Sequence, residues 1–317
     1  MPSLLARFAE DLFWLARYVE RAENLARILD VNETFARDSE GEQDWLPVVQ
    51  LYSDEDRFLK RHRRATAAAV IEFYVLDPRN PSSILSAVRA ARENARALRH
   101  LISTEMWQQL NVFHGEIAAL RKRDVSLPRL SRVCGRIKES CQAHTGITEG
   151  TLYRDEGWCF YQIGKHIERA DQTSRLLDMR YHRMKLRGAD AGADVREWNA
   201  LLRSVAGYQA FRRAHPLNMK IEDVAAFLLF ETDFPRSMAC SLLEVDLMFD
   251  MLEGHHALPM SRQTRAVLKR LTTMLSPRST VKSRRNVQGL HTFIDQVQLN
   301  LLALGEEMGR VYFAHET

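Results

Sequence analysis

The sequence predicts an all-α fold: an internally duplicated helical bundle with no β-sheet. Glycine and proline number only 14 and 9 in 317 residues, and they lie mostly between segments rich in helix-forming residues. Apolar residues near the start recur in alternating steps of four and three, as on the core-facing side of a bundle helix. A charged motif in that first segment returns later in the chain, which indicates a repeat.

The recurring motif reads E-R-A-(E/D)-x-x-(A/S)-R-(I/L)-L-D. It begins at Glu20 in LFWLARYVERAENLARILDV and again at Glu168 in FYQIGKHIERADQTSRLLDM, 148 residues later. A second pair of segments, FYVLDPRNPSSIL from Phe73 and FLLFETDFPRSMA from Phe227, matches at an offset of 154. Two motifs in the same order indicate a duplicated unit. We expect a first helical repeat over 1–150 and a second over 151–317, packed as one compact unit.

The individual helices follow from periodicity and from residues that begin or end a helix. The first is expected from near Ser3, an acceptable N-cap, to at least residue 35. Pro78 and Pro81 end one helix, and Ser82 or Ser83 caps the next. The segment 186–195 is glycine-containing and predicts a linker. Further helices are expected over 45–52, 54–74, 105–123, 198–213, 236–252, 261–275 and 287–311. Another is expected to begin at 128, and the segment with the second copy of the motif is expected to be helical as far as 186.

Composition restricts the classes of function. The formal net charge of +4 is small, and acidic and basic residues are interspersed, so a nucleic-acid partner is not expected. The basic runs at 60–64 and 282–285 are most simply solvated faces, although a phosphate or acidic partner is an alternative. No apolar stretch approaches the ~20 residues that span a bilayer, and the start lacks the apolar core of a signal peptide. We therefore expect a cytoplasmic protein without a membrane partner.

The cysteines and short motifs give little sign of catalysis. None of Cys134, Cys141, Cys159 and Cys240 has zinc-site spacing, so reduced and mostly buried thiols are expected. The dinucleotide, P-loop, nucleophile-elbow and H-E-x-x-H motifs are missing from the sequence. The Glu-x-x-His pattern of di-metal bundles is not met either. We expect no cofactor, no metal site and, on balance, no enzymatic activity.

Each copy of the motif places charged residues along one edge of its apolar seam. An acid precedes a base by four residues, the favourable order, so each strip can simply hold helix to helix. Alternatively, the strips meet about a pseudo-twofold axis, and their carboxylates bind a cation or act as acid and base. Glu20 and Glu168 are then the catalytic candidates. The residues of the two strips are Glu20, Arg21, Glu23, Arg27, Glu168, Arg169, Asp171 and Arg175.

Four arginines are candidates for binding a substrate or an anion. Arg89, Arg92 and Arg96 follow helical steps, and Glu93 can partner part of this ladder. Arg236 lies at an expected helix N-terminus, where the helix dipole disfavours a cation. Arginine suits bidentate binding of carboxylate or phosphate, while a solvated face is the alternative for the ladder.

Four ordered segments resemble the bacterial alpha-E domain family: FWLARYVERAENLARILDVN, RENARALRHLISTEMWQQLN, GWCFYQIGKHIERADQTSRLLD and FPRSM. Together they cover nearly the whole chain. The resemblance implies a helical protein encoded beside circularly permuted ATP-grasp amidoligases, transglutaminase-like peptidases and sometimes a proteasome-like peptidase. His166 and Asp171 depart from what many members carry, which suggests a specialised second strip. The family-like positions are Glu20, Arg21, Glu23, Arg27, Arg89, Glu93, Arg96, Glu168, Arg169, Pro235, Arg236 and Ser237.

The resemblance implies an accessory partner of an ATP-grasp peptide or amide ligase, non-catalytic or weakly catalytic, which binds the ligase or its peptide product. A transglutaminase-like peptidase is a second implied partner, and a homo-oligomer is compatible with the sequence. One alternative is an enzyme acting on peptide or amide substrates, with Glu20 and Glu168 as acid and base and arginines holding a carboxylate. Another is a helical bundle that binds a metal through its clustered carboxylates.

Overall fold

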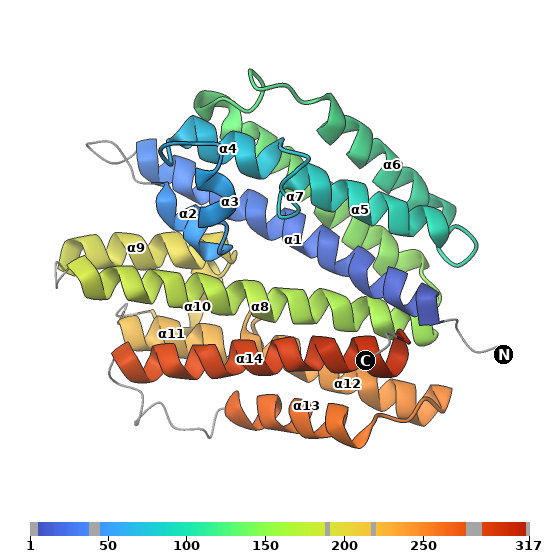
Figure 1. Cartoon of the computed structure of the whole chain (residues 1–317). Helices are drawn as coiled ribbons and strands as arrows, with labels where there is room; N and C mark the ends of the chain where they lie inside the picture. Colours follow the sequence, from blue (N-terminus) through green and yellow to red (C-terminus); the bar gives the residue numbers. More distant parts are fainter. Residues whose placement is uncertain (1–5, 38–44, 188–190, 217–219, 277–286, 315–317) are drawn as a thin grey trace. The chain divides into compact units, whose positions relative to one another are not determined.

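The computed structural model describes residues 6–37, 45–187, 191–216, 220–276 and 287–314 (Figure 1). These residues form fourteen α-helices and no strand, which confirms the predicted all-α class. Among the described helices, none combines the length and the apolar character that crossing a membrane requires.

The chain forms two compact units. The N-terminal unit comprises residues 14–153, and the C-terminal unit comprises residues 1–13 together with 154–317. The first helix, α1 (Ala6–Arg37), therefore contributes its opening turns to one unit and the rest of its length to the other. The predicted repeats, 1–150 and 151–317, were drawn from sequence matches, and they stay a prediction.

The N-terminal unit continues from α1 through three short helices and three longer ones. Helix α5 packs against α6, and α6 packs against α7 (Figure 1). The expected helical run over 54–74 is wrong in one respect, because it is interrupted between Leu59 and Thr66, where Thr66 caps a new helix through its hydroxyl. The helices are α2 (Leu46–Leu51), α3 (Glu55–Leu59), α4 (Ala67–Val75), α5 (Ile84–Ala97), α6 (Thr104–Ala119) and α7 (Leu127–Thr151).

The C-terminal unit is built around a second long helix, α8, which packs against α12 and α14 (Figure 1). The predicted linker over 186–195 is wrong in extent, because α8 continues to Arg187 and α9 begins at Ala191. The helices are α8 (Glu156–Arg187), α9 (Ala191–Ser204), α10 (Tyr208–Ala214), α11 (Ile221–Phe230), α12 (Met238–His256), α13 (Arg262–Met274) and α14 (Val287–Tyr312).

The apolar seam predicted on α1 is largely core. Leu12, Leu15, Val19, Ala22 and Leu29 are all buried. Steps of three and four residues return to the same side of a helix, so this pattern alone marks the face that packs inward. The charged residues at the edge of that seam are consequently held close to the core.

The same capped turn precedes one long helix of each unit. Ser83 begins α5: its hydroxyl accepts from the Ser86 amide at 3.1 Å and donates to the Asp77 carbonyl at 2.8 Å. Ser237 begins α12 in the same manner, accepting from the Cys240 amide at 3.0 Å and donating to a carbonyl six residues upstream. Such caps satisfy backbone groups that a helix end leaves without partners.

Candidate functional site: charged strips on the two longest helices

The first strip lies on α1 in the N-terminal unit and forms hydrogen bonds along its own helix. Glu20 Oε1 accepts from the side-chain amide of Asn24 at 3.1 Å. One turn away, Glu23 accepts from the guanidinium Nε of Arg27 at 3.0 Å and also from its Nη2. Glu20 and Glu23 are only 3% and 4% exposed. Both carboxylates are therefore buried acceptors with a donor four residues further along.

The second strip, on α8 in the C-terminal unit, has the same geometry. Glu168 Oε1 accepts from the side-chain amide of Gln172 at 3.1 Å, and Asp171 accepts from Nε of Arg175 at 2.8 Å. Glu168 is fully buried. Each strip thus consists of a carboxylate–amide pair beside a carboxylate–arginine pair. The pairing of the two strips about a pseudo-twofold axis stays a prediction.

These contacts favour a structural role for the four carboxylates. A buried charged group is costly unless it is hydrogen-bonded or paired, and every carboxylate of the strips has such a donor on its own helix. A general acid or base needs a free path to the proton it transfers. The catalytic candidacy of Glu20 and Glu168 stays a hypothesis, with the observed hydrogen bonds weighing against it.

The arginine that follows the first glutamate of each motif reaches away from the strip. In the N-terminal unit, the guanidinium of Arg21 lies over the ring of Tyr18, 5.8 Å from its centroid. In the C-terminal unit, Arg169 donates to the carbonyl of Pro235 at 3.3 Å. This bond ties α8 to the turn before α12. Thr173 adds a second tie, because its hydroxyl donates to the carbonyl of Arg236 at 3.0 Å.

The last residue of each motif meets the last helix of its unit. Asp30 on α1 accepts from the ammonium of Lys138 on α7 at 2.5 Å. Asp178 on α8 lies 2.7 Å from Nδ1 of His291 on α14, and Nε2 of the same imidazole lies 3.4 Å from a carboxylate oxygen of Asp295. The oxygen and nitrogen atoms that these three residues offer all lie within 4.8 Å of one another.

Two arginines of the ladder on α5 form ion pairs. Arg92 and Arg96 both pair with Glu93, at 2.9 and 2.8 Å. Arg92 also donates from Nε to the side-chain oxygen of Asn111 at 2.7 Å. Arg89 is exposed. Arg96 is exposed as well, and anion binding by the ladder stays a prediction.

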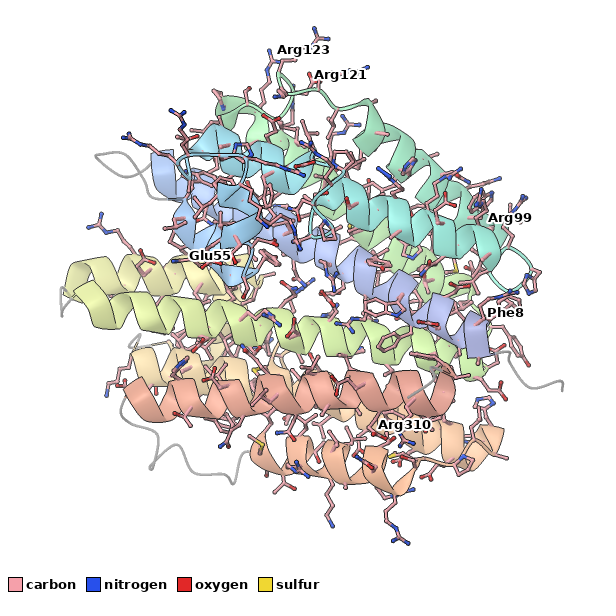
Figure 2. All side chains as sticks on the ribbon, viewed as in Figure 1. Phe8, Glu55, Arg99, Arg121, Arg123 and Arg310 are labelled. Atoms are coloured by element: carbon pink, nitrogen blue, oxygen red, sulfur yellow. The ribbon has the colours of Figure 1, made fainter. Side chains whose placement is uncertain are left out.

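Trp107 on α6 is in contact with Arg92 of the ladder and with Arg99, two residues after α5. The guanidinium carbons of Arg92 and Arg99 lie 5.5 and 5.2 Å from its ring centroid, and Arg99 is seen at the end of α5 in Figure 2. Cation–π contacts of this kind hold guanidinium planes in place. Burial, followed by the positive charges of Arg92 and Arg89, lowers the pKa of the nearby His114, so its imidazole is neutral near pH 7.

The structure corrects the prediction for Arg236. The expected helix start at Arg236 is wrong, because Ser237 is the N-cap and α12 begins at Met238. The residue therefore precedes the cap, and the argument from the helix dipole does not apply to it. Arg236 is nonetheless only 9% exposed. An anion-binding role for this buried guanidinium stays a prediction.

The cysteines carry no sign of nucleophilic chemistry. All four are free thiols, as predicted, with Cys134, Cys141 and Cys159 buried and Cys240 half-buried. Burial raises the pKa of Cys159 to about 12. Burial raises the pKa of Cys134 and Cys240 as well. Only the thiolate is an effective nucleophile, so these three thiols are unreactive near neutral pH.

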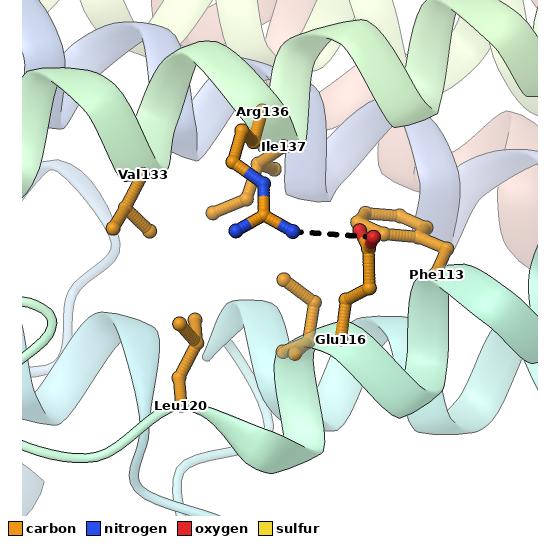
Figure 3. A pocket seen from close by; sticks show the side chains of 7 residues that line it. Phe113, Glu116, Leu120, Val133, Arg136 and Ile137 are labelled. Atoms are coloured by element: carbon orange, nitrogen blue, oxygen red, sulfur yellow. Dashed lines mark ion pairs between the residues drawn. The ribbon is translucent and has the colours of Figure 1, made fainter.

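A pocket lies between α6 and α7 in the N-terminal unit (Figure 3). Its lining is mainly apolar, and an ion pair between Arg136 and Glu116 at 3.1 Å bridges the two helices beside it. The cavity measures about 20 Å³, which is room for about one water molecule. It is far below the size of a pocket for a peptide or cofactor, so it is not a substrate site.

Sequence reasoning missed the partners of the two motif-ending aspartates. Lys138 and His291 lie 108 and 113 residues away from Asp30 and Asp178. Periodicity identifies the face of a helix that packs inward, but not the distant residue that meets it. The one available signal was the i, i+4 spacing of His291 and Asp295, since ligands four apart share a helix face.

Comparisons with known proteins agree with the sequence motifs. A family model described as a predicted alpha-helical domain with a conserved ER motif matches residues 4–313, which confirms the family resemblance. Uncharacterized proteins of Mycobacterium bovis and Mycobacterium tuberculosis are 28% identical over 268 residues, or 76% of this chain. The match takes in 29% of each relative, so the chain spans less than a third of their length. A search of solved structures gave no significant match.

Proposed function

This chain belongs to the Alpha-E family, and from that premise we propose that it is an accessory protein of an ATP-grasp peptide- or amide-ligase system. It binds the ligase or its peptide product and contributes little or no chemistry of its own. A transglutaminase-like peptidase is a second partner of the same system. The partners are proposed from the family resemblance of the four sequence motifs.

One observation carries the non-catalytic part of the proposal. The glutamates that open the two motifs, Glu20 and Glu168, are 3% and 0% exposed, and each accepts a hydrogen bond from an amide on the next turn of its own helix. Buried and bonded in this way, a carboxylate positions helices better than it exchanges protons with a substrate. The strips therefore serve the fold, and binding takes place elsewhere on the surface.

We also propose that the two units are copies of one duplicated element. Contacts recur at an offset of 153 or 154 residues: Phe58 stacks on His62 and Phe211 on His215, both at 4.7 Å between ring centroids. Ser53 and Ala206 both have positive φ, 52° and 56°. The fourteen described helices divide into two successive sets of seven, α1 to α7 and α8 to α14, each of which begins with a 32-residue helix. Matching strips, caps and turns support this reading.

The exposed basic side of α5 is the docking surface that best suits an acidic partner or a peptide carboxylate. Arg89, Arg96 and Arg99 are exposed there, and Trp107 offers an aromatic face beside them. Arginine and tryptophan are the residues most often found at the centre of protein interfaces. Charges of this kind also accelerate association with an oppositely charged partner.

The test is a pull-down of the products of neighbouring genes, followed by an ATP-dependent ligation assay with and without this protein. Capture of the ligase, and faster ligation in the presence of this protein, would support the proposal. The double change Arg89→Glu and Arg96→Glu should weaken capture. Arg132→Glu, at an exposed position on α7, is the matched control and should leave it unchanged.

Two further variants separate the accessory protein from the enzyme. Glu20→Gln and Glu168→Gln keep a side chain of the same shape but remove the charge. If the accessory role is right, ligation persists at a fixed concentration of folded protein while thermal stability falls. Loss of all activity with unchanged stability would instead favour the enzyme with paired carboxylates.

A further inference from the structure

We propose that the C-terminal unit carries a binding site for one divalent transition-metal ion, best matched by Zn²⁺, made by Asp178, His291 and Asp295. Nε2 of His291 and a carboxylate oxygen of Asp295 are the direct ligands, and Asp178 holds the imidazole in place. The site joins α8 to α14, which pack against each other within this unit (Figure 1). The inference does not rest on the proposed ligase partnership.

The first step is the orientation of the imidazole. Nδ1 of His291 lies 2.7 Å from Oδ1 of Asp178. An ionised carboxylate only accepts hydrogen bonds, so the proton is on Nδ1. A metal ion that binds this imidazole would therefore take the place of a proton at the other nitrogen, Nε2. A carboxylate behind the distal nitrogen is the usual arrangement for a histidine that binds metal.

The second step is the distance between the two direct ligands. Nε2 of His291 lies 3.4 Å from Oδ2 of Asp295, which is four residues further along α14. Zinc–nitrogen and zinc–oxygen bonds near 2.1 Å at a tetrahedral angle place the two ligand atoms about 3.4 Å apart. A direct charge-assisted hydrogen bond is shorter, about 2.7–2.9 Å. The spacing is therefore compatible with an ion bound to both atoms.

The third step is the comparison with the N-terminal unit. There, the aspartate at the same place in the motif, Asp30, pairs with the ammonium of Lys138, so a cation already joins the long helix to the last helix. In the C-terminal unit, an imidazole takes the place of that ammonium, and Asp295 adds a second carboxylate. Gln142 is the N-terminal counterpart of Asp295, 153 residues earlier. The C-terminal site thus has an imidazole and two carboxylates where the N-terminal unit has one ammonium and one carboxylate.

Exposure indicates the kind of site. The side chains of His291 and Asp295 are 40% and 48% exposed, whereas Asp178 is 23% exposed. Two protein ligands leave about two positions of a tetrahedral ion for water or another ligand. The ion is therefore exchangeable and open to a further ligand, unlike the closed four-ligand sites that hold zinc fingers together.

Calorimetric titration of the untagged full chain with ZnCl₂ tests the site. We expect one ion whose affinity falls at least tenfold in His291→Lys and Asp295→Asn, and about 10–100-fold in Asp178→Asn. His291→Lys reproduces the Lys138 arrangement, so its thermal unfolding should stay cooperative. Cobalt in place of zinc should give the visible absorption of a tetrahedral ion. Absence of zinc binding, or unchanged binding in folded His291→Lys, would overturn the proposal.

The N-terminal unit offers a gain-of-site test. Lys138 and Gln142 are four residues apart on α7, as His291 and Asp295 are on α14. The double variant Lys138→His and Gln142→Asp should therefore bind a second zinc ion beside Asp30. Lys138→His alone lacks the second ligand and should not. A folded double variant that still binds one ion would overturn the geometric rule on which the site rests.

Discussion

The two units treat the same position of their shared motif in different ways. Asp30 faces the ammonium of Lys138, whereas Asp178 faces the imidazole of His291. One unit therefore has a lysine–carboxylate ion pair at this position of the motif, and the other has the imidazole that we propose as a zinc ligand. The same position of the motif does not imply the same chemistry, and the pairs of matched residues show where the units diverge.

The largest expected effect concerns the close approach of backbone to backbone in the C-terminal unit. A Cβ on Gly164 would meet the carbonyl oxygen of Phe13, its carbonyl carbon at 2.9 Å and its Cα at 3.0 Å. Backbone atoms cannot move aside cheaply, so Gly164→Ala should lower the free energy of unfolding by about 3 kcal/mol. Chemical denaturation measures the loss.

The matched position of the N-terminal unit is Ala16, a buried residue that already carries a Cβ. The control is Gly254→Ala on α12, where an added Cβ meets nothing within 4 Å. That change should be neutral or stabilise by up to ~1 kcal/mol. If the Gly164→Ala protein is as stable as the parent, then α8 has room for a Cβ at residue 164, as α1 has at Ala16.

The next effect depends on pH. Burial lowers the pKa of His144, in the N-terminal unit, to about 4, against 6.5 in the unfolded chain. Above pH 6.5 both states are neutral at this residue. Between pH 6.5 and 4 only the unfolded state gains the proton, so stability falls with falling pH by about 1.4 kcal/mol per unit, about 3 kcal/mol in total.

Val297 is the counterpart of His144, 153 residues later, and is equally buried. His144→Val should therefore flatten the fall in stability between pH 6.5 and 4 while leaving other acid-sensitive groups unaffected. Urea unfolding midpoints at pH 7, 6, 5 and 4.5 give the comparison. Parallel curves for the parent and the variant would contradict the assignment.

A smaller and symmetrical effect is expected at the two helix caps. Ser83→Ala and Ser237→Ala each remove a hydroxyl that accepts from the first turn and donates to an upstream carbonyl. Each should cost about 1 kcal/mol, and the two losses should be equal within experimental error. Thermal unfolding of both variants tests whether the turns are equivalent, and a difference above ~1 kcal/mol would count against it.

The smallest effect is expected at the ion pair beside the pocket. Arg136 and Glu116 have side chains that are 60% and 40% exposed. Glu116→Gln should therefore change the free energy of unfolding by less than ~0.5 kcal/mol. Lys269 and Gly289 of the C-terminal unit lie 153 residues after Glu116 and Arg136. Those two residues cannot form an ion pair with each other. A large loss on mutation would mark this contact as a real difference between the units.

Much of the fold could be predicted because the signals for a helix come from residues that are close together in the sequence. The three- and four-residue spacing of Leu12, Leu15 and Val19 identified the buried face of α1. Serine after proline placed the next cap at Ser82 or Ser83, and Ser83 is the N-cap. The break before Thr66 was missed because the basic run at 60–64 has no strong helix-breaking residue. Arg236 was placed in a helix because two possible start positions lie next to each other.

The candidate site was less predictable because its contacts join distant parts of the chain. The donors to Glu20 and Glu168 lie four residues away, so the strips could be anticipated from spacing. The cation beside Asp30 comes from another helix, and its identity depends on how α1 and α7 pack. Sequence spacing cannot supply that register.

The placement of α1 has a consequence for the order in which this protein is completed during synthesis. Phe13 belongs to the C-terminal unit, and its ring lies 5.2 Å from that of Phe313. The start of α1 therefore packs against residues that are synthesised long after it. Residues 14–153 of the N-terminal unit can assemble before α14 has been made, whereas the C-terminal unit lacks part of its core until then.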